Sequence, residues 1–133
     1  MGQPAAKQGD MITAVDIHIV MVPSPGGPVP TPLPHPFSGA LSGNLSPNVN
    51  IGGMPAATVG STANNTPPHI PTPPGTMFQI PPTNQATIMM GSATVNINHR
   101  PAARAGDTVQ TCADPMPNTA GVLAAMGTVF IGG

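Results

Sequence analysis

Residues 101–107 read Pro-Ala-Ala-Arg-Ala-Gly-Asp, and this heptapeptide decides the fold because variants of it occur three times in the chain. Residues 4–10 read Pro-Ala-Ala-Lys-Gln-Gly-Asp, and residues 55–61 read Pro-Ala-Ala-Thr-Val-Gly-Ser. Self-similarity at a period of this length indicates that each copy belongs to one supersecondary unit. The chain is therefore predicted to contain three related units.

A Val-x-Ile segment accompanies each unit. Residues 49–51 and 95–97 read Val-Asn-Ile and stand shortly before the second and third Pro-Ala-Ala, whereas residues 129–131 read Val-Phe-Ile and have no Pro-Ala-Ala after them. The alternation places two apolar side chains on one face, as in a short strand. Because the first Pro-Ala-Ala lacks such a segment before it, we expect residues 129–131 to pair with the N-terminal segment and close a ring.

The composition favours short strands and turns. The 133 residues include 20 Pro and 16 Gly, only 2% are aromatic and 5% are charged, and such a chain is a poor helix former. We predict an all-β fold, a small cone of three pseudo-threefold β repeats with long Pro-rich loops, closed between the N- and C-termini. One domain is expected over residues 1–133, with repeats at approximately 4–54, 55–100, and 101–133 joined to 1–3.

Two Pro-rich stretches, residues 22–36 and 66–82, are inserted in the first two repeats. They are expected to wrap the outside of the cone as extended or polyproline segments. So much Pro and Gly is also typical of disorder, but 39% apolar residues and a net charge of −1 are not. The same net charge disfavours nucleic-acid binding. No secretory signal pattern is present, so synthesis in the cytoplasm is expected.

A metal site is predicted from equivalent positions in the repeats. His18 and His69 each follow the first proline of their repeat by fourteen residues, and Cys112 follows its own by eleven. Threefold closure would bring the two imidazoles and the thiol together, and three such ligands leave one corner of a tetrahedral zinc site open. His35, from the Pro-rich insertion, is expected to fill that corner. His99 is expected to lie at another level and not to bind.

A centre with four protein ligands has no open position for water, so one structural Zn²⁺ per chain is expected and catalysis is not. A zinc hydrolase would also need a nearby general base, and the chain contains no glutamate. Two alternatives remain open. One is a Pro-rich, metal-binding adaptor, and the other is a carrier module.

The repeats resemble the PAAR family, whose Pro-Ala-Ala-Arg motif stands unchanged at residues 101–104 and is varied in its last position in the other two repeats. The resemblance implies a sharp cone with zinc near its apex. Its base would dock on a trimeric spike of the valine-glycine-repeat or phage-spike-like kind in a contractile injection system, either type VI secretion or an extracellular phage-tail-like particle.

In that setting the chain is expected at the tip of the particle, where it would help to puncture the target membrane and could attach effector cargo, with no effector extension of its own. In the adaptor or carrier alternatives it would not act as a puncturing tip. The docking base is expected at the ends of the Val-x-Ile strands, and its six candidate residues are Val49, Ile51, Val95, Ile97, Val129 and Ile131.

Overall fold

The computed structural model describes residues 2–132, which form strands, turns and loops without a helix, so the predicted all-β class is confirmed. It follows that no helix in this part of the chain has the length and hydrophobicity needed to cross a bilayer. The thirteen strands are β1 (Gln3–Pro4), β2 (Met11–Val22), β3 (Val29–Gly43), β4 (Asn50–Ile51), β5 (Met54–Pro55), β6 (Thr62–Asn65), β7 (Met77–Phe78), β8 (Gln85–Ile88), β9 (Asn96–Ile97), β10 (Arg100–Pro101), β11 (Val109–Gln110), β12 (Val122–Ala124) and β13 (Phe130–Ile131).

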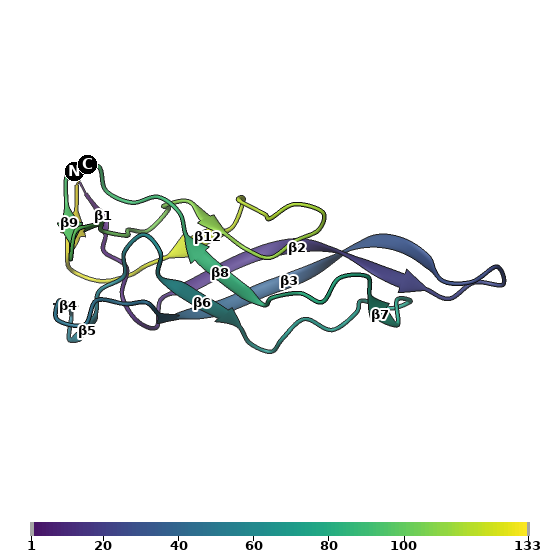
Figure 1. The fold of residues 1–133 in the computed structure, drawn as a ribbon. Coiled ribbons are helices and arrows are strands. Elements are labelled where there is room, and N and C mark those ends of the chain that lie inside the picture. Colours follow the sequence, from purple (N-terminus) through teal and green to yellow (C-terminus); the bar gives the residue numbers. More distant parts are fainter. Residues whose placement is uncertain (1, 133) are drawn as a thin grey trace.

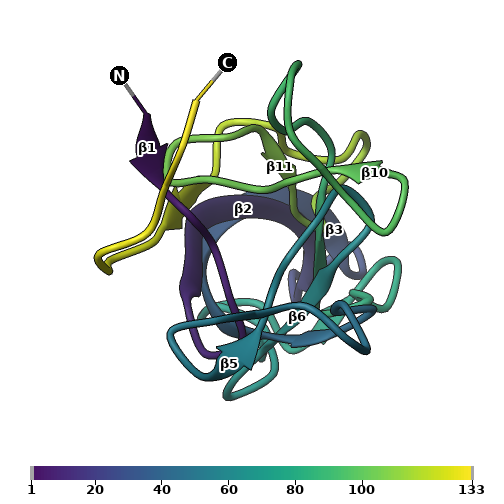
Figure 2. The same ribbon diagram turned by 90° about the vertical axis from the view of Figure 1, so that its left-hand side faces the viewer.

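Three short antiparallel pairs form a ring at the broad end of the molecule. These are β4 with β5, β9 with β10, and β1 with β13, and each pairs a Val-x-Ile segment with the residues that enter a Pro-Ala-Ala. Gln3 is opposite Ile131, so the expected closure of the first segment on the last is confirmed. Figure 2 looks onto this end, with β1, β5 and β10 at three corners around the ring.

The second alanines of the three motifs hold the ring together. The amide of Ala57 donates to the carbonyl of Ala6 (3.0 Å), that of Ala103 to Ala57 (3.1 Å), and that of Ala6 to Ala103 (2.9 Å). All three side chains are fully buried. The three backbones approach so closely that larger side chains would overfill the space between them. The three Pro-Ala-Ala segments therefore surround the pseudo-threefold axis of the fold.

A seven-stranded sheet extends from the ring, with the order β11-β8-β6-β3-β2-β12 and β7 also paired to β2. The core beneath it is aliphatic apart from Phe37, and its largest other members are Ile12, Leu41, Ile88 and Leu123. Strands β2 and β3 pair continuously from Met11 opposite Ala40 to Val22 opposite Val29. Their hairpin reaches far beyond the other strands and gives the molecule its tapered end (Figure 1).

The first Pro-rich stretch is extended, which is one of the two expected forms, but it is a strand of the sheet and does not wrap the outside, so that part of the prediction was wrong. Residues 29–36 are the first half of β3 and are hydrogen-bonded to β2. Proline stands at every second position, Pro30, Pro32, Pro34 and Pro36. In an antiparallel pair alternate residues direct their backbone N–H away from the partner strand, so prolines with this spacing cost the ladder no hydrogen bond. The carbonyl of Pro34 accordingly faces away from β2 and accepts from the Thr72 hydroxyl at 2.9 Å.

The second Pro-rich stretch, residues 66–82, is mostly irregular and lies along the hairpin (Figure 1). It covers the buried side of β2 rather than the outside of a cone, because Gly75 packs directly against the fully buried side chain of Val20. Within the stretch β7 pairs with β2, placing Phe78 opposite Val20. The stretch thereby encloses the side chains that form the site described next.

Candidate metal centre

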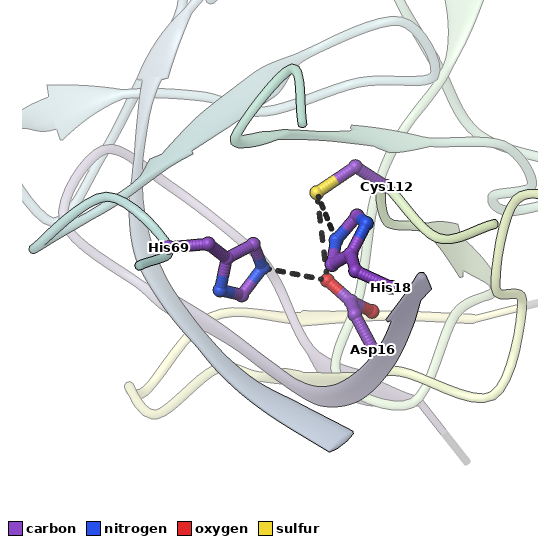
Figure 3. Close-up of side chains that lie close together, drawn as sticks. All are labelled: Asp16, His18, His69 and Cys112. Carbon is purple, nitrogen blue, oxygen red and sulfur yellow. Dashed lines mark hydrogen bonds and ion pairs between the residues drawn. The ribbon is translucent and has the colours of Figure 1, made fainter. Parts of the chain in front are cut away.

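Strand β2 supplies two side chains that could bind a metal ion. Asp16 and His18 are separated by one residue, so their side chains point to the same face of the strand, and both are buried, with exposed fractions of 0% and 1%. Figure 3 shows the two side chains rising from β2 toward His69 and Cys112. This face is the one that residues 66–82 cover.

The other two donors come from the second and third repeats. His69 follows β6, and Cys112 follows β11. The carboxylate Oδ2 of Asp16 lies 3.3 Å from His69 Nε2 and 3.6 Å from Cys112 Sγ, and Cys112 Sγ lies 3.5 Å from His18 Nε2. One donor atom from each of these four residues lies within 4.8 Å of every other. The repeats thus bring together His18, His69 and Cys112, the three side chains that the sequence predicted to meet.

Neighbouring polar groups orient the cluster. Nδ1 of His18 lies 3.1 Å from a carboxylate oxygen of Asp114, a contact that leaves Nε2 facing the centre. Nδ1 of His69 lies 3.2 Å from the side-chain nitrogen of Asn65. The other oxygen of Asp16 accepts from the hydroxyl of Thr111 and, at 3.2 Å, from Asn118. Asp16, His18 and His69 are therefore each held by a contact outside the cluster.

Burial controls the ionisation of the donors. Desolvation lowers the pKa of His69 below 6.5, although its hydrogen bond to Asp16 opposes this, and burial thus favours the neutral ring that can bind a metal. Desolvation likewise raises the pKa of Cys112 above 9.0, against the smaller effect of the Asn84 backbone. A metal must therefore displace the thiol proton, which makes its affinity rise with pH.

A groove of about 380 Å³ connects the cluster to solvent. His18 and Cys112 line its inner end, and its walls include Ile80, Pro82 and Met89. Cys112 is only partly buried, in contrast to Asp16 and His18. The groove therefore provides a path by which an ion can reach the thiol.

His35 is buried next to the cluster but does not belong to it. Its ring centroid lies 5.4 Å from that of His18 and 5.6 Å from that of His69. Both ring nitrogens are engaged, because Nδ1 lies 2.8 Å from the Leu33 carbonyl and Nε2 lies 3.1 Å from the Thr72 amide. As placed, His35 has no lone pair directed at the centre.

Asp16 is the member of the cluster that sequence reasoning missed. It precedes His18 by two residues in an alternating apolar strand, so its carboxylate had to face the same buried side as the imidazole. That spacing is the signal that was available in the sequence. A carboxylate buried to this extent needs cationic or hydrogen-bonding partners, and the cluster provides them.

The remaining sequence candidates lie at the ring. Side chains of Val95 and Val129 are 36% and 42% exposed, and Val49 and Ile51 are half-buried. Ile97 and Ile131 are instead buried in a small cluster with the first alanines of the motifs. His99 is exposed in the turn between β9 and β10 with a φ of 69°, and it lies at the opposite end from His18.

The donor set suits zinc. Bond lengths of about 2.0–2.3 Å at tetrahedral angles separate N, O and S donors by about 3.3–3.6 Å. Three of the donor separations, 3.3, 3.5 and 3.6 Å, fall in this range, and all of the donor atoms lie within 4.8 Å of one another. The cluster is set back from the end of the hairpin, since residues 19–22 and 29–32 continue past it, whereas zinc was expected at the apex itself.

A comparison with protein-family models adds an independent observation. Residues 79–133, which include residues 101–133 of the third repeat, match the model described as PAAR motif. This part of the chain carries a PAAR motif, which is consistent with a PAAR-repeat protein. PAAR-motif proteins are structural components associated with the spike of contractile injection systems, so the match indicates a role related to the spike tip. No curated protein matched the chain.

Proposed function

We propose that this PAAR-motif chain caps the trimeric spike of a contractile injection system, with its ring on the spike and its hairpin pointing forward. The observation that carries the proposal is the ring of alanine hydrogen bonds, in which one chain reproduces threefold symmetry. A partner with three identical chains presents three identical surfaces, and a ring of three similar corners matches them.

The docking surface would be formed by the strand ends at the ring. Val95 and Val129 are exposed there at equivalent positions of β9–β10 and β13–β1, and Val49 occupies the third corner. Phe130, 60% exposed, adds apolar area at one corner. Apolar side chains that are exposed at a symmetric end of a molecule fit a protein interface.

A structural Zn²⁺ would join the three repeats on the tapered side. Held by His18, His69 and Cys112 with Asp16 at the fourth corner, it would connect β2 to the segments after β6 and β11. When bound, the ion supplies cross-links that a narrow domain with a small core otherwise lacks. In this setting the hairpin would act as a rigid point that assists membrane puncture, and attached effectors would travel with it.

The docking test uses the trimeric spike protein of the same injection system and measures complex mass by light scattering. One chain per spike trimer is expected. Val95→Asp combined with Val129→Asp should weaken the complex by tenfold or more, because two charges would be buried at the interface. Val122→Asp, which changes a more exposed valine (56%) on β12 away from the ring, should leave the complex intact.

An equal loss of spike binding in the ring variant and in Val122→Asp would contradict the proposal that the ring docks on the spike. So would a complex that has another stoichiometry and is not weakened by the substitutions in the ring. Metal-dependent folding without any spike binding would instead favour the adaptor or carrier alternative.

A further inference from the structure

The β2–β3 hairpin has a continuous apolar surface on the side away from the metal centre, which we name the outer face. Alternate residues of both strands form it, and across the hairpin they stand opposite one another as the pairs Val15 with Pro36, Ile17 with Pro34, Ile19 with Pro32, and Met21 with Pro30. Met77 of β7 extends it beside Met21. Val15, Ile17 and Met77 are 61%, 40% and 58% exposed, and all four prolines are exposed.

Charge is absent from the outer face. Residues 17–36 contain no Lys, Arg, Asp or Glu, and Asp16 points to the opposite, buried side. The ion pairs of the described chain that involve Lys or Arg, Lys7 with Asp10 and Arg104 with Asp107, lie in the turns of the ring. Contiguous exposed apolar area of this kind marks contact with a partner or a membrane, and a charged or strongly polar partner would find nothing here to bind.

The edges of the hairpin argue against another strand as the occupant. Along the first half of β3 every outward backbone position is a proline, which has no N–H to donate. On the far edge of β2 the carbonyls of Ile17, Ile19 and Met21 accept from backbone amides of residues 114, 79 and 76. A second copy or an extended peptide therefore cannot add to this part of the sheet by the usual main-chain pairing.

We propose that the outer face binds the hydrocarbon layer of a target bilayer, and that it does so without the force of contraction. The inference rests on the proposed tip function, which would make the hairpin the first part of the machine to meet that bilayer. Aliphatic and proline side chains enter an acyl layer without desolvating a charge, and proline loses no rotamer freedom on burial. Binding should therefore depend on acyl chains, and neither on anionic headgroups nor on salt.

Vesicle flotation of the full, metal-loaded chain tests this proposal. Binding to phosphatidylcholine vesicles is expected, with similar affinity when phosphatidylserine is added and at low or high salt. Met77→Glu and Pro32→Glu, one on each side of the face, should each lower the partition coefficient by about tenfold or more. Met126→Glu makes the same change at a 79% exposed methionine beside Lys7 of the ring and should have no effect.

Pro32→Val keeps the outer face apolar but restores a backbone N–H at the strand edge. It should retain binding, which would show that binding depends on the apolar face and not on the missing N–H group of the edge. Metal content and thermal unfolding of each variant confirm that the fold is intact. Binding restricted to anionic vesicles would overturn the proposal, as would no binding. So would concentration-dependent self-association that Met77→Glu abolishes, since a second copy would then cover the face. Any of these results leaves spike docking unaffected, because docking is measured at the ring.

Discussion

At the scale of single residues, the sequence and the structure assign different residues to the fourth position of the metal centre. The sequence favoured His35 because it is the extra histidine of a long insertion, whereas the structure places the Asp16 carboxylate among the other three donors. His35 has its two ring nitrogens committed to the Leu33 carbonyl and the Thr72 amide. Asp16 is therefore expected to contribute more to metal affinity than His35.

Conservative replacements test this difference. Asp16→Asn keeps the size of the side chain but loses its charge, and it should weaken zinc binding by at least about tenfold, in line with the cost of disturbing a metal site. His35→Gln should leave the affinity close to that of the parent. Competition with a chelating dye measures both, and the absorption spectrum of the Co²⁺-loaded protein reports the ligand set. Metal loss in His35→Gln together with retention in Asp16→Asn would restore the assignment made from the sequence.

Repeat equivalence was enough to predict three of the four clustered donors, because His18, His69 and Cys112 occupy related positions of similar units. It was not enough for Asp16, which has no repeat counterpart among the donors and whose position depends on β2 continuing as a regular strand. Counting residues from the start of each repeat identifies positions that the repeats share. Which way a side chain points depends on the local backbone, which this count does not describe.

At the scale of elements, the β2–β3 hairpin is where sequence reasoning failed. Dense proline was interpreted as an extended or polyproline segment on the outside of the molecule, yet its period of two matches the alternation of outward N–H groups in an antiparallel strand of the sheet. A proline at Thr31 or Leu33, whose backbones pair with Val20 and His18, would remove a ladder hydrogen bond. The spacing of the prolines, rather than their number, therefore decides between the two structures.

The cover over the hairpin gives an element-scale prediction. A Cβ added to Gly75 would lie 2.5 Å from a methyl group of Val20, so Gly75→Ala should destabilise the protein by about 1–3 kcal/mol through overpacking. Gly26→Ala, in the hairpin turn where a Cβ meets nothing within 4 Å, should be neutral or slightly stabilising. Urea unfolding measures both. Equal stability of the two variants would show that residues 66–82 do not cover β2 in solution.

At the scale of the whole molecule, the ring predicted from Pro-Ala-Ala and Val-x-Ile is confirmed, including its closure by β1 and β13. The sequence could predict this because closure is a property of the repeat pattern itself. The elongated outline was less accessible, since it depends on one insertion forming a hairpin much longer than the repeat that contains it.

Ring closure predicts that the order of the repeats in the chain can be changed. A circular permutant that joins the natural ends through a short glycine linker and opens between Gly52 and Gly53, in an exposed turn, should unfold cooperatively near the parent temperature and bind zinc. Opening between Ala56 and Ala57, both fully buried in the ring, should prevent folding. Failure of the first permutant with success of the second would contradict the closed ring.

Joining three units in one polypeptide also changes what mutation can do to them. In a true homotrimer a single codon change alters three equivalent positions at once, so any group on the axis appears in triplicate. Here each unit has its own codons. Histidine can therefore persist in two units while cysteine replaces it in the third, and one strand can lengthen into a hairpin without the others following. The alanine ring preserves the symmetry that a threefold partner requires, while the opposite end is free to diversify.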